Sequence, residues 1–147
     1  MVNPYTWDAI GETVNQNVSL KPEPGYATFI GLVLIPSFVI GISNGDSAVA
    51  LFLNDKFVLL TEHQPKNPPI GSGAARLAPF SARLDQRWKL LLMSDGVWKY
   101  IGWETIIWRC AAHSGQTLIS NLRDVAIKNT GGTLLDDFSV ILIESCA

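Results

Sequence analysis

The most apolar window of the chain, Ala27 to Ile42, constrains the fold more than any other segment. It reads ATFIGLVLIPSFVIGI, carries no charged residue and is interrupted by Pro36. A proline lacks a backbone donor and breaks both helices and central strands. The window also falls short of the ~20 residues that a membrane-spanning helix needs. It therefore predicts two apolar β-strands joined by a turn.

The same pattern of short β-rich runs and turn residues continues downstream. The predicted strands are Ala27 to Leu34, Ser37 to Ser43, Ala48 to Asn54 and Lys56 to Thr61. Turn signals separate them at Ile35-Pro36, Asn44-Gly45-Asp46 and Asn54-Asp55, which predicts an antiparallel meander. The run VALFL is apolar at every position, and this indicates a strand covered on both faces.

Outside these strands the chain alternates between loops and helical patterns. Tyr5 to Asn17 predicts a short helix, and Lys21 to Gly25, with two prolines and a glycine, predicts a loop. The proline-rich stretch Glu62 to Gln86 reads as a long excursion, and such loops are often functional. Trp88 to Ser94 then predicts a buried strand.

The C-terminal third predicts two helices and a last strand. Apolar residues recur at helical spacing in Trp103 to Ala112 and in Thr117 to Lys128, with Gly131-Gly132 as a stop. The final strand is Phe138 to Glu144. We therefore expect an α+β fold, with antiparallel β-sheets packed with helices, in a single domain over residues 1–147.

The composition and the N-terminal sequence indicate which classes of partner and which cellular compartment to expect. The chain is 48% hydrophobic with a net charge of −2, and no basic stripe suggests a nucleic-acid partner. Cys110 and Cys146 have no spacing typical of a disulfide framework or a zinc site, so two reduced thiols are expected. Met1 to Asn17 lacks the features of a signal peptide, so we expect a cytoplasmic protein without membrane partners.

Asp95 is the first candidate for chemistry. The apolar run LLLM leads directly into Ser94-Asp95-Gly96, so a strand end would present the carboxylate from a rigid scaffold. The glycine would let the backbone approach a ligand closely. Hard cations such as Mg²⁺ and Mn²⁺ prefer carboxylate oxygens. A plain turn is the alternative interpretation of Asp95-Gly96.

Asp136 and Asp137 form the second candidate, before the last apolar strand. Adjacent strand residues face opposite ways, so only one of them is expected to share a site with Asp95. Two converging carboxylates raise a pKa unless a cation compensates them, which favours a metal. A helix N-cap or turn role for Asp136 is the alternative. A third motif, Asn44-Gly45-Asp46, is suited to a tight hairpin.

Taken in order, these motifs resemble the metal-dependent type 2C protein serine/threonine phosphatases. The family's strand, Gly-Asp-Ser hairpin and strand are similar to FVIGISNGDSAVALF, and its Leu-Thr-x-Asp-His-x-Pro is similar to Leu59 to Pro65. Its Ser-Asp-Gly-aliphatic-Trp and Asp-Asn-x-Thr/Ser motifs are matched by Ser94 to Trp98 and by Asp136 to Ser139. The resemblance covers about Gly25 to Glu144, the C-terminal half of the family's β-sandwich domain.

The resemblance implies hydrolysis of phosphoserine and phosphothreonine at a pair of Mn²⁺ or Mg²⁺ ions. It carries over Asp95 and Asp136 as metal ligands, with Asp137 in place of the family's Asn and Asp46 as a structural turn residue. The family's N-terminal Glu-Asp pair, Asp-Gly-x-Gly-Gly loop and phosphate-binding arginine have no counterpart in this sequence. Weak metal binding and weak or no activity of the isolated chain are therefore expected.

Three functional hypotheses follow. In the first, the chain is a phosphatase domain acting on phosphoproteins, and its missing half is supplied by another segment or partner. In the second, it is a non-catalytic pseudophosphatase acting as a binding module. In the third, it is a self-associating homodimer, since half of a β-sandwich exposes apolar edges. Four further polar residues have a substrate-contacting or acid-base interpretation beside the commoner one of solvated surface groups: Arg76, Arg83, His63 and His113.

Overall fold

The computed structural model describes residues 4–20, 25–53 and 56–145. These residues form two compact units, one built from residues 4–20, 25–47 and 61–83 and the other from residues 48–53, 56–60 and 84–145. Most of the predicted loop from Lys21 to Gly25, and the predicted turn at Asn54-Asp55, lie outside the described residues.

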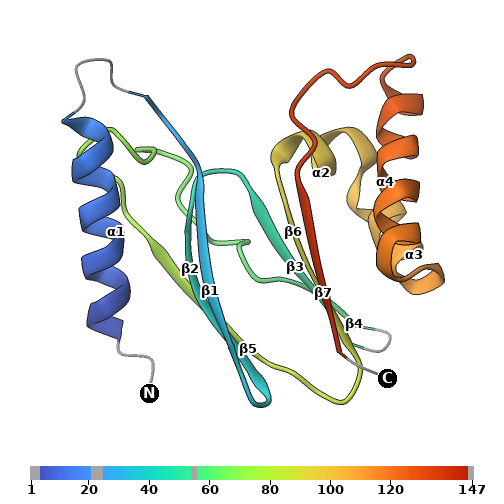
Figure 1. The fold of residues 1–147 in the computed structure, drawn as a ribbon, viewed down its shortest axis with the longest axis horizontal. Helices are drawn as coiled ribbons and strands as arrows, with labels where there is room; N and C mark the ends of the chain where they lie inside the picture. Colours follow the sequence, from blue (N-terminus) through green and yellow to red (C-terminus); the bar gives the residue numbers. More distant parts are fainter. Residues whose placement is uncertain (1–3, 21–24, 54–55, 146–147) are drawn as a thin grey trace. The chain divides into compact units, whose positions relative to one another are not determined.

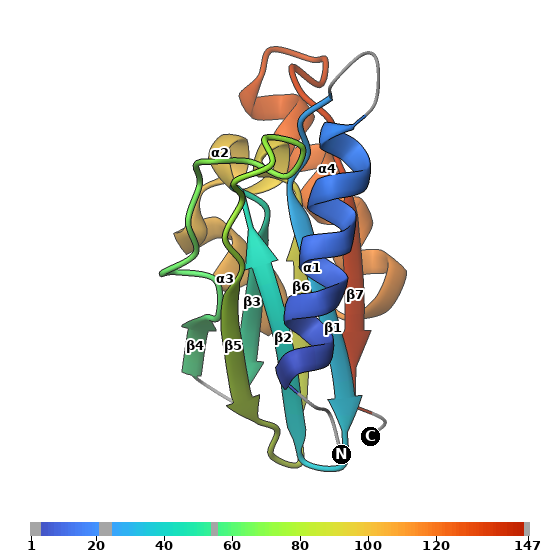
Figure 2. The same cartoon turned by 90° about the vertical axis from the view of Figure 1, so that its left-hand side faces the viewer.

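The first unit contains a three-stranded antiparallel sheet in the order β1-β2-β5, made of β1 (Phe29–Ile35), β2 (Phe38–Asn44) and β5 (Ala78–Arg83). The two strands predicted from the Ala27 to Ile42 window are thus confirmed, with the turn at Pro36. The predicted N-terminal helix is also confirmed as α1 (Pro4–Ser19), which runs beside β1 and β2 (Figures 1 and 2).

The long excursion predicted from Glu62 to Gln86 is partly wrong, because it contains β5. Pro79 hid this strand, since proline is rare inside sheets; β5 pairs with β2 and lies at a sheet edge, where proline is tolerated. The loop before β5 is held by side-chain hydrogen bonds. Asn44 Nδ2 donates to the carbonyls of Pro68 (3.2 Å) and Arg76 (2.8 Å), and Asn15 Oδ1 accepts the Gly71 N–H at 3.0 Å.

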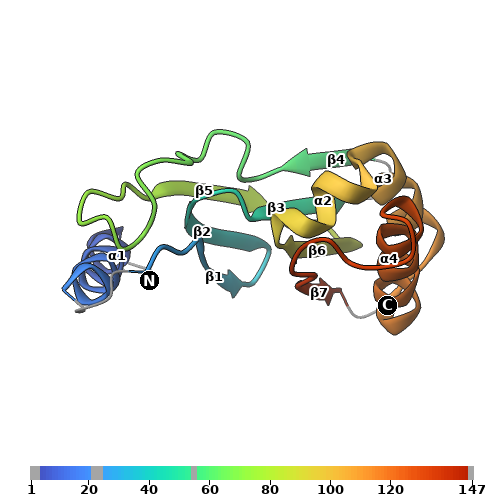
Figure 3. The same cartoon turned by 90° about the horizontal axis from the view of Figure 1, so that it is seen from above.

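The second unit contains a four-stranded antiparallel sheet in the order β4-β3-β6-β7. Its strands are β3 (Ala48–Leu53), β4 (Lys56–Leu59), β6 (Trp88–Met93) and β7 (Val140–Glu144), and its helices are α2 (Asp95–Ile101), α3 (Trp103–Ala112) and α4 (Gly115–Asn129). The three helices cover one face of this sheet (Figure 3).

The core of the second unit lies between this sheet face and the helices. Alternate residues of β3 and β6 contribute Ala50, Phe52, Leu91 and Met93, and they contact the buried helix residues Val97, Ile101, Ile106, Cys110, Leu118, Leu122 and Ala126. Each fully buried large aliphatic side chain contributes about 1.5–3 kcal/mol. β3 is buried along nearly its whole length, as its uninterrupted apolar run predicted.

The predicted single meander is wrong, because β2 and β3 belong to different sheets. β2 pairs with β5 and β3 pairs with β6, so Asn44-Gly45-Asp46 joins two sheets and is not a hairpin turn. Gly45 does adopt the expected positive φ of 104°. Its N–H donates to the Pro65 carbonyl at 2.9 Å, so the link is fixed by the following loop and not by cross-strand pairing.

Both predicted C-terminal helices are confirmed, α3 with the predicted bounds and α4 slightly longer at each end. α2 was not predicted. The architecture is nevertheless the expected α+β class, with antiparallel sheets packed with helices. Among the helices of the described residues, none combines the length and the hydropathy of a membrane span.

Candidate functional site

Asp95 lies where the central strand β6 passes into α2. The strand ends at Met93, Ser94 occupies the N-cap position with extended φ and ψ, and Asp95 is the first helical residue. A carboxylate in the first turn interacts favourably with the helix dipole. The rigid strand end expected from the sequence is therefore present, but a helix and not a plain turn follows it.

Asp136 and Asp137 lie in an irregular segment just before β7. The argument that they would face opposite ways on a strand is therefore wrong, since neither is in a strand. Both residues are exposed, and Asp136 Oδ1 accepts the N–H of Asp137 at 2.8 Å. Asp136 thus has the local turn-stabilising contact that was the alternative interpretation, and one of its oxygens is already used.

Three hydrogen bonds connect Ser94 to this segment. The Ser94 N–H donates to the Ser139 carbonyl at 3.0 Å, and the Ser94 hydroxyl donates to the Asp137 carbonyl at 2.6 Å and accepts the Ser139 N–H at 3.1 Å. We call this set the Ser94 bridge. It joins the residue before Asp95 to the residues after Asp136, and so it brings the two predicted ligands into one region.

Gly96 completes the close approach. A Cβ added there would lie 2.5 Å from the Asp137 carbonyl oxygen and 3.0 Å from the Cβ of Asp136. The first distance is too short for any side chain, so glycine is required by backbone proximity. Gly96 therefore faces the side chain of Asp136 and the backbone carbonyl of Asp137.

Lys99 dominates the electrostatics of Asp95. Its ammonium pairs with the Asp95 carboxylate one helical turn earlier, and this hydrogen bond lowers the pKa of Asp95 below its usual value, although partial burial opposes the shift. The expectation that two converging carboxylates would raise a pKa is not met at Asp95, whose pKa is lowered.

The donors present fit a hydrated hard cation but not a closed metal site. Within residues 4–20, 25–53 and 56–145, no group of three or more His, Cys, Asp or Glu side chains is placed to hold a metal. Mg²⁺ commonly retains several waters and binds through one or two carboxylates plus substrate phosphates. Asp95 and Asp136 offer that number of carboxylates, so their role as ligands stays a prediction of a weak, open site.

The other polar candidates belong to other elements of the chain. Arg76, Arg83 and His63 are exposed residues of the first unit, whereas both aspartates belong to the second. Asp46, the predicted turn residue, lies in the bend after β2. His113 is the C-cap of α3 and contributes its backbone carbonyl to a hydrogen bond from Lys89.

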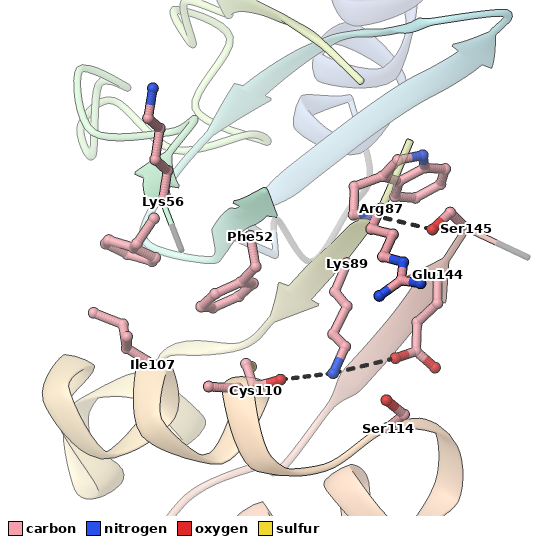
Figure 4. Close-up of a pocket in the computed structure, with 12 residues that line it drawn as sticks. Phe52, Lys56, Arg87, Lys89, Ile107, Cys110, Ser114, Glu144 and Ser145 are labelled. Carbon is pink, nitrogen blue, oxygen red and sulfur yellow. Dashed lines mark hydrogen bonds and ion pairs between the residues drawn. The ribbon is translucent and has the colours of Figure 1, made fainter. Parts of the chain in front are cut away.

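The second unit also has an open groove of about 1230 Å³ at the other end of β6 from Asp95 (Figure 4). Its lining includes Phe52, Ile107 and Cys110. Lys89 also lines the groove, and its Nζ donates to the carbonyls of Cys110 (2.6 Å) and His113 (2.5 Å) and lies 3.8 Å from Glu144 Oε1. Glu144 Oε2 accepts the Gly115 N–H at 2.9 Å. These contacts join the end of α3 and the start of α4 to the sheet, so Lys89 and Glu144 stabilise the fold.

Sequence reasoning missed Lys99 and Ser94. The Asp95 to Lys99 spacing of four residues is a helix-pair signal, but it is visible only once a helix is assigned after Gly96. The role of Ser94 has no local signal, because its partners lie more than forty residues later in the chain.

Comparison with known proteins places this architecture among phosphatases. No protein-family model matches the sequence, and no curated protein matches it either. Solved structures do match. A bacterial serine phosphatase has a TM-score of 0.76 at 17% identity, covering 95% of this chain and 67% of its own. The Mycobacterium tuberculosis serine/threonine phosphatase PstP/Ppp has 0.75 at 14% identity, covering 94% and 68%. The S. agalactiae serine/threonine phosphatase has 0.77 at 16% identity, covering 95% and 69%.

The chain therefore has the fold of bacterial serine/threonine phosphatases, and the resemblance stated from the sequence motifs is confirmed at the level of the fold. The chain spans only about two thirds of the length of these structures. The remaining third of those proteins has no counterpart in this chain.

Proposed function

We propose that residues 1–147 act as one partial type 2C-like phosphatase domain, which hydrolyses phosphoserine and phosphothreonine in proteins with Mn²⁺ or Mg²⁺ held at Asp95 and Asp136. The observation that supports this most is the Ser94 bridge, because it brings the two aspartates of separate sequence motifs to one end of β6. The phosphatase fold of the structural neighbours supports the reaction class.

Asp95 and Asp136 would supply negative charge and oxygen donors for the cation. When bound, such ions neutralise phosphoryl oxygens and lower the pKa of a bound water. Cation binding at Asp95 competes with Lys99 for the same carboxylate. Two carboxylates provide few ligands, so the isolated chain is expected to be weakly active or inactive, and further ligands would come from another segment or a partner.

Hydrolysis of p-nitrophenyl phosphate by the full chain, with and without Mn²⁺, tests this proposal. We expect slow Mn²⁺-dependent turnover that Asp95→Ala abolishes and that Asp124→Ala preserves. Asp124 is a suitable control because it is an exposed carboxylate on α4 of the same unit. Turnover that is equal in both variants would contradict the assignment of Asp95.

A second candidate function, a non-catalytic pseudophosphatase that self-associates, is favoured by the edge strand β7. β7 pairs with β6 on one side and, among the described residues, with no strand on the other. Its sequence VILIE carries no Lys or Pro, the residues that commonly protect sheet edges, and Ile141 is 58% exposed. Symmetric antiparallel pairing of two copies of β7 about Leu142 would place Val140 opposite Glu144 and keep the two acidic side chains apart.

Sedimentation velocity of the full chain separates the two candidates. Self-association predicts a dimer that Ile141→Lys dissociates, whereas Trp108→Lys, at a similarly exposed residue of α3 (60%), leaves it intact. A monomer at high concentration would contradict self-association. Metal-dependent turnover that Asp95→Ala abolishes would exclude the non-catalytic interpretation.

A further inference from the structure

Ser94 is at the N-cap of α2, but its hydroxyl does not serve the helix. An N-cap serine usually accepts a hydrogen bond from a backbone N–H of the first turn. The Ser94 hydroxyl makes no such capping bond. It donates to the Asp137 carbonyl and accepts the Ser139 N–H, so its bonding capacity is used on the segment that carries Asp136.

The two segments that Ser94 connects differ in how firmly they are held. Asp95 is fixed by β6 and by the first turn of α2, whereas Asp136 lies in an exposed irregular segment. Such a segment is ordered by its few hydrogen bonds, because it lacks a ladder of its own. The backbone pair between Ser94 and Ser139 extends the pairing of β6 with β7 by one step, and the hydroxyl adds the contact to Asp137 that reaches toward Asp136.

We infer that Ser94 is a positioning residue whose hydroxyl sets the separation between Asp95 and Asp136. This inference rests on the proposed function for its consequence, since the separation matters for cation binding. It does not rest on that function for the contact itself. Gly96 sets the lower limit of the approach, because its missing Cβ leaves room for Asp136 and Asp137, and Ser94 prevents the segment from moving away.

Two measurements on the full chain test the inference, with Ser94→Val compared with Ser94→Thr. Threonine keeps the hydroxyl, whereas valine has a methyl group in its place. Both side chains are branched at Cβ, so both variants carry the same cost of the added methyl group. Ser120→Ala, at an exposed serine of α4, is the control for loss of an unrelated hydroxyl.

The first measurement is hydrogen exchange of the Ser139 amide by NMR, which needs no metal. We expect exchange to be about tenfold faster in Ser94→Val than in Ser94→Thr, with similar melting temperatures. Equal exchange in the two variants would overturn the inference. If both variants fail to fold, Ser94→Ala and Ser94→Cys provide the same comparison without a branched side chain.

The second measurement is the dissociation constant for Mn²⁺, from the electron paramagnetic resonance signal of the free ion. Residues that orient metal ligands typically change affinity 10–100-fold. We expect a change of about this size for Ser94→Val and wild-type-like affinity for Ser94→Thr and Ser120→Ala. Equal affinity in Ser94→Val and wild type would overturn the positioning role. If the wild type itself binds no Mn²⁺, the proposed function fails, and the exchange measurement still decides whether Ser94 holds the segment.

Discussion

The Lys99 ammonium pairs with the carboxylate of Asp95, one turn earlier on α2. This pair means that the predicted metal ligand is already charge-compensated when no cation is bound. Lys99 and Asp95 have 45% and 23% of their side chains exposed, so solvent screening keeps the net stabilisation of the pair to about 0.3–0.5 kcal/mol.

The pair predicts a specific pH dependence. The pKa of Asp95 is lowered in the folded state, so its contribution to stability is fully present above the ordinary aspartate value of 3.8 and is lost as the pH falls through the lower folded value. Replacing Lys99 by Met removes the hydrogen bond that lowers the pKa of Asp95 most. A carboxyl-carbon NMR titration should then give an Asp95 pKa closer to 3.8. An unchanged pKa in Lys99→Met would show that Lys99 does not control this group.

Gly96→Ala tests the close approach of the two segments. The new Cβ would lie 2.5 Å from the Asp137 carbonyl oxygen, and the backbone must shift to relieve this clash. We expect a loss of about 1–3 kcal/mol in the free energy of unfolding, measured with urea. Gly25→Ala is the control, because nothing lies within 4 Å of the Cβ added there and its change should stay within about 0.5 kcal/mol. Equal stability of both variants would show that Gly96 does not lie close to the Asp137 carbonyl.

Lys89→Met should be strongly destabilising. The substitution leaves the carbonyls of Cys110 and His113 without their donor and Glu144 without its counter-charge. We expect a loss of about 2–4 kcal/mol in urea unfolding. Lys128→Met, at an exposed lysine in the last turn of α4, should change stability little. Glu144→Gln added to Lys89→Met should cost less than the sum of the single changes, and strict additivity would contradict the coupling of the two groups.

The Cys110 thiol should be unreactive in the folded protein. Burial raises its pKa to about 12, and the thiolate is the reactive form. In a chain with Cys146→Ser, iodoacetamide at pH 8 should leave the native protein unmodified and label one thiol after unfolding in guanidinium, as counted by mass spectrometry. Rapid labelling of the native protein would show that Cys110 is not buried.

The sequence predicts elements well where the signal is local. The apolar spacing of Trp103, Ile106 and Cys110 gives α3 its correct bounds, because a helix buries one face at that period. β5 was missed because Pro79 argues against a strand unless the strand is known to lie at an edge. The meander was wrong because the partners of β2 and β3 are set by contacts with β5 and β6, which follow much later in the chain.

The same distinction holds for the candidate site. The sequence motifs indicate Asp95 and Asp136, and the structure brings their segments together. α2 was not anticipated, since Asp95-Gly96 is typical of a turn, and without that helix the pairing with Lys99 is invisible. Ser94 is a common residue whose importance comes from partners distant in sequence.

Joint binding of one cation by Asp95 and Asp136 can be measured with a double-mutant cycle on Mn²⁺ binding. The free Mn²⁺ signal is measured with the wild type, Asp95→Ala, Asp136→Ala and the double variant. If both residues serve one site, each single substitution should abolish most of the affinity, and the double variant should bind no more weakly than the weaker single variant. Wild-type affinity in both single variants would contradict the claim.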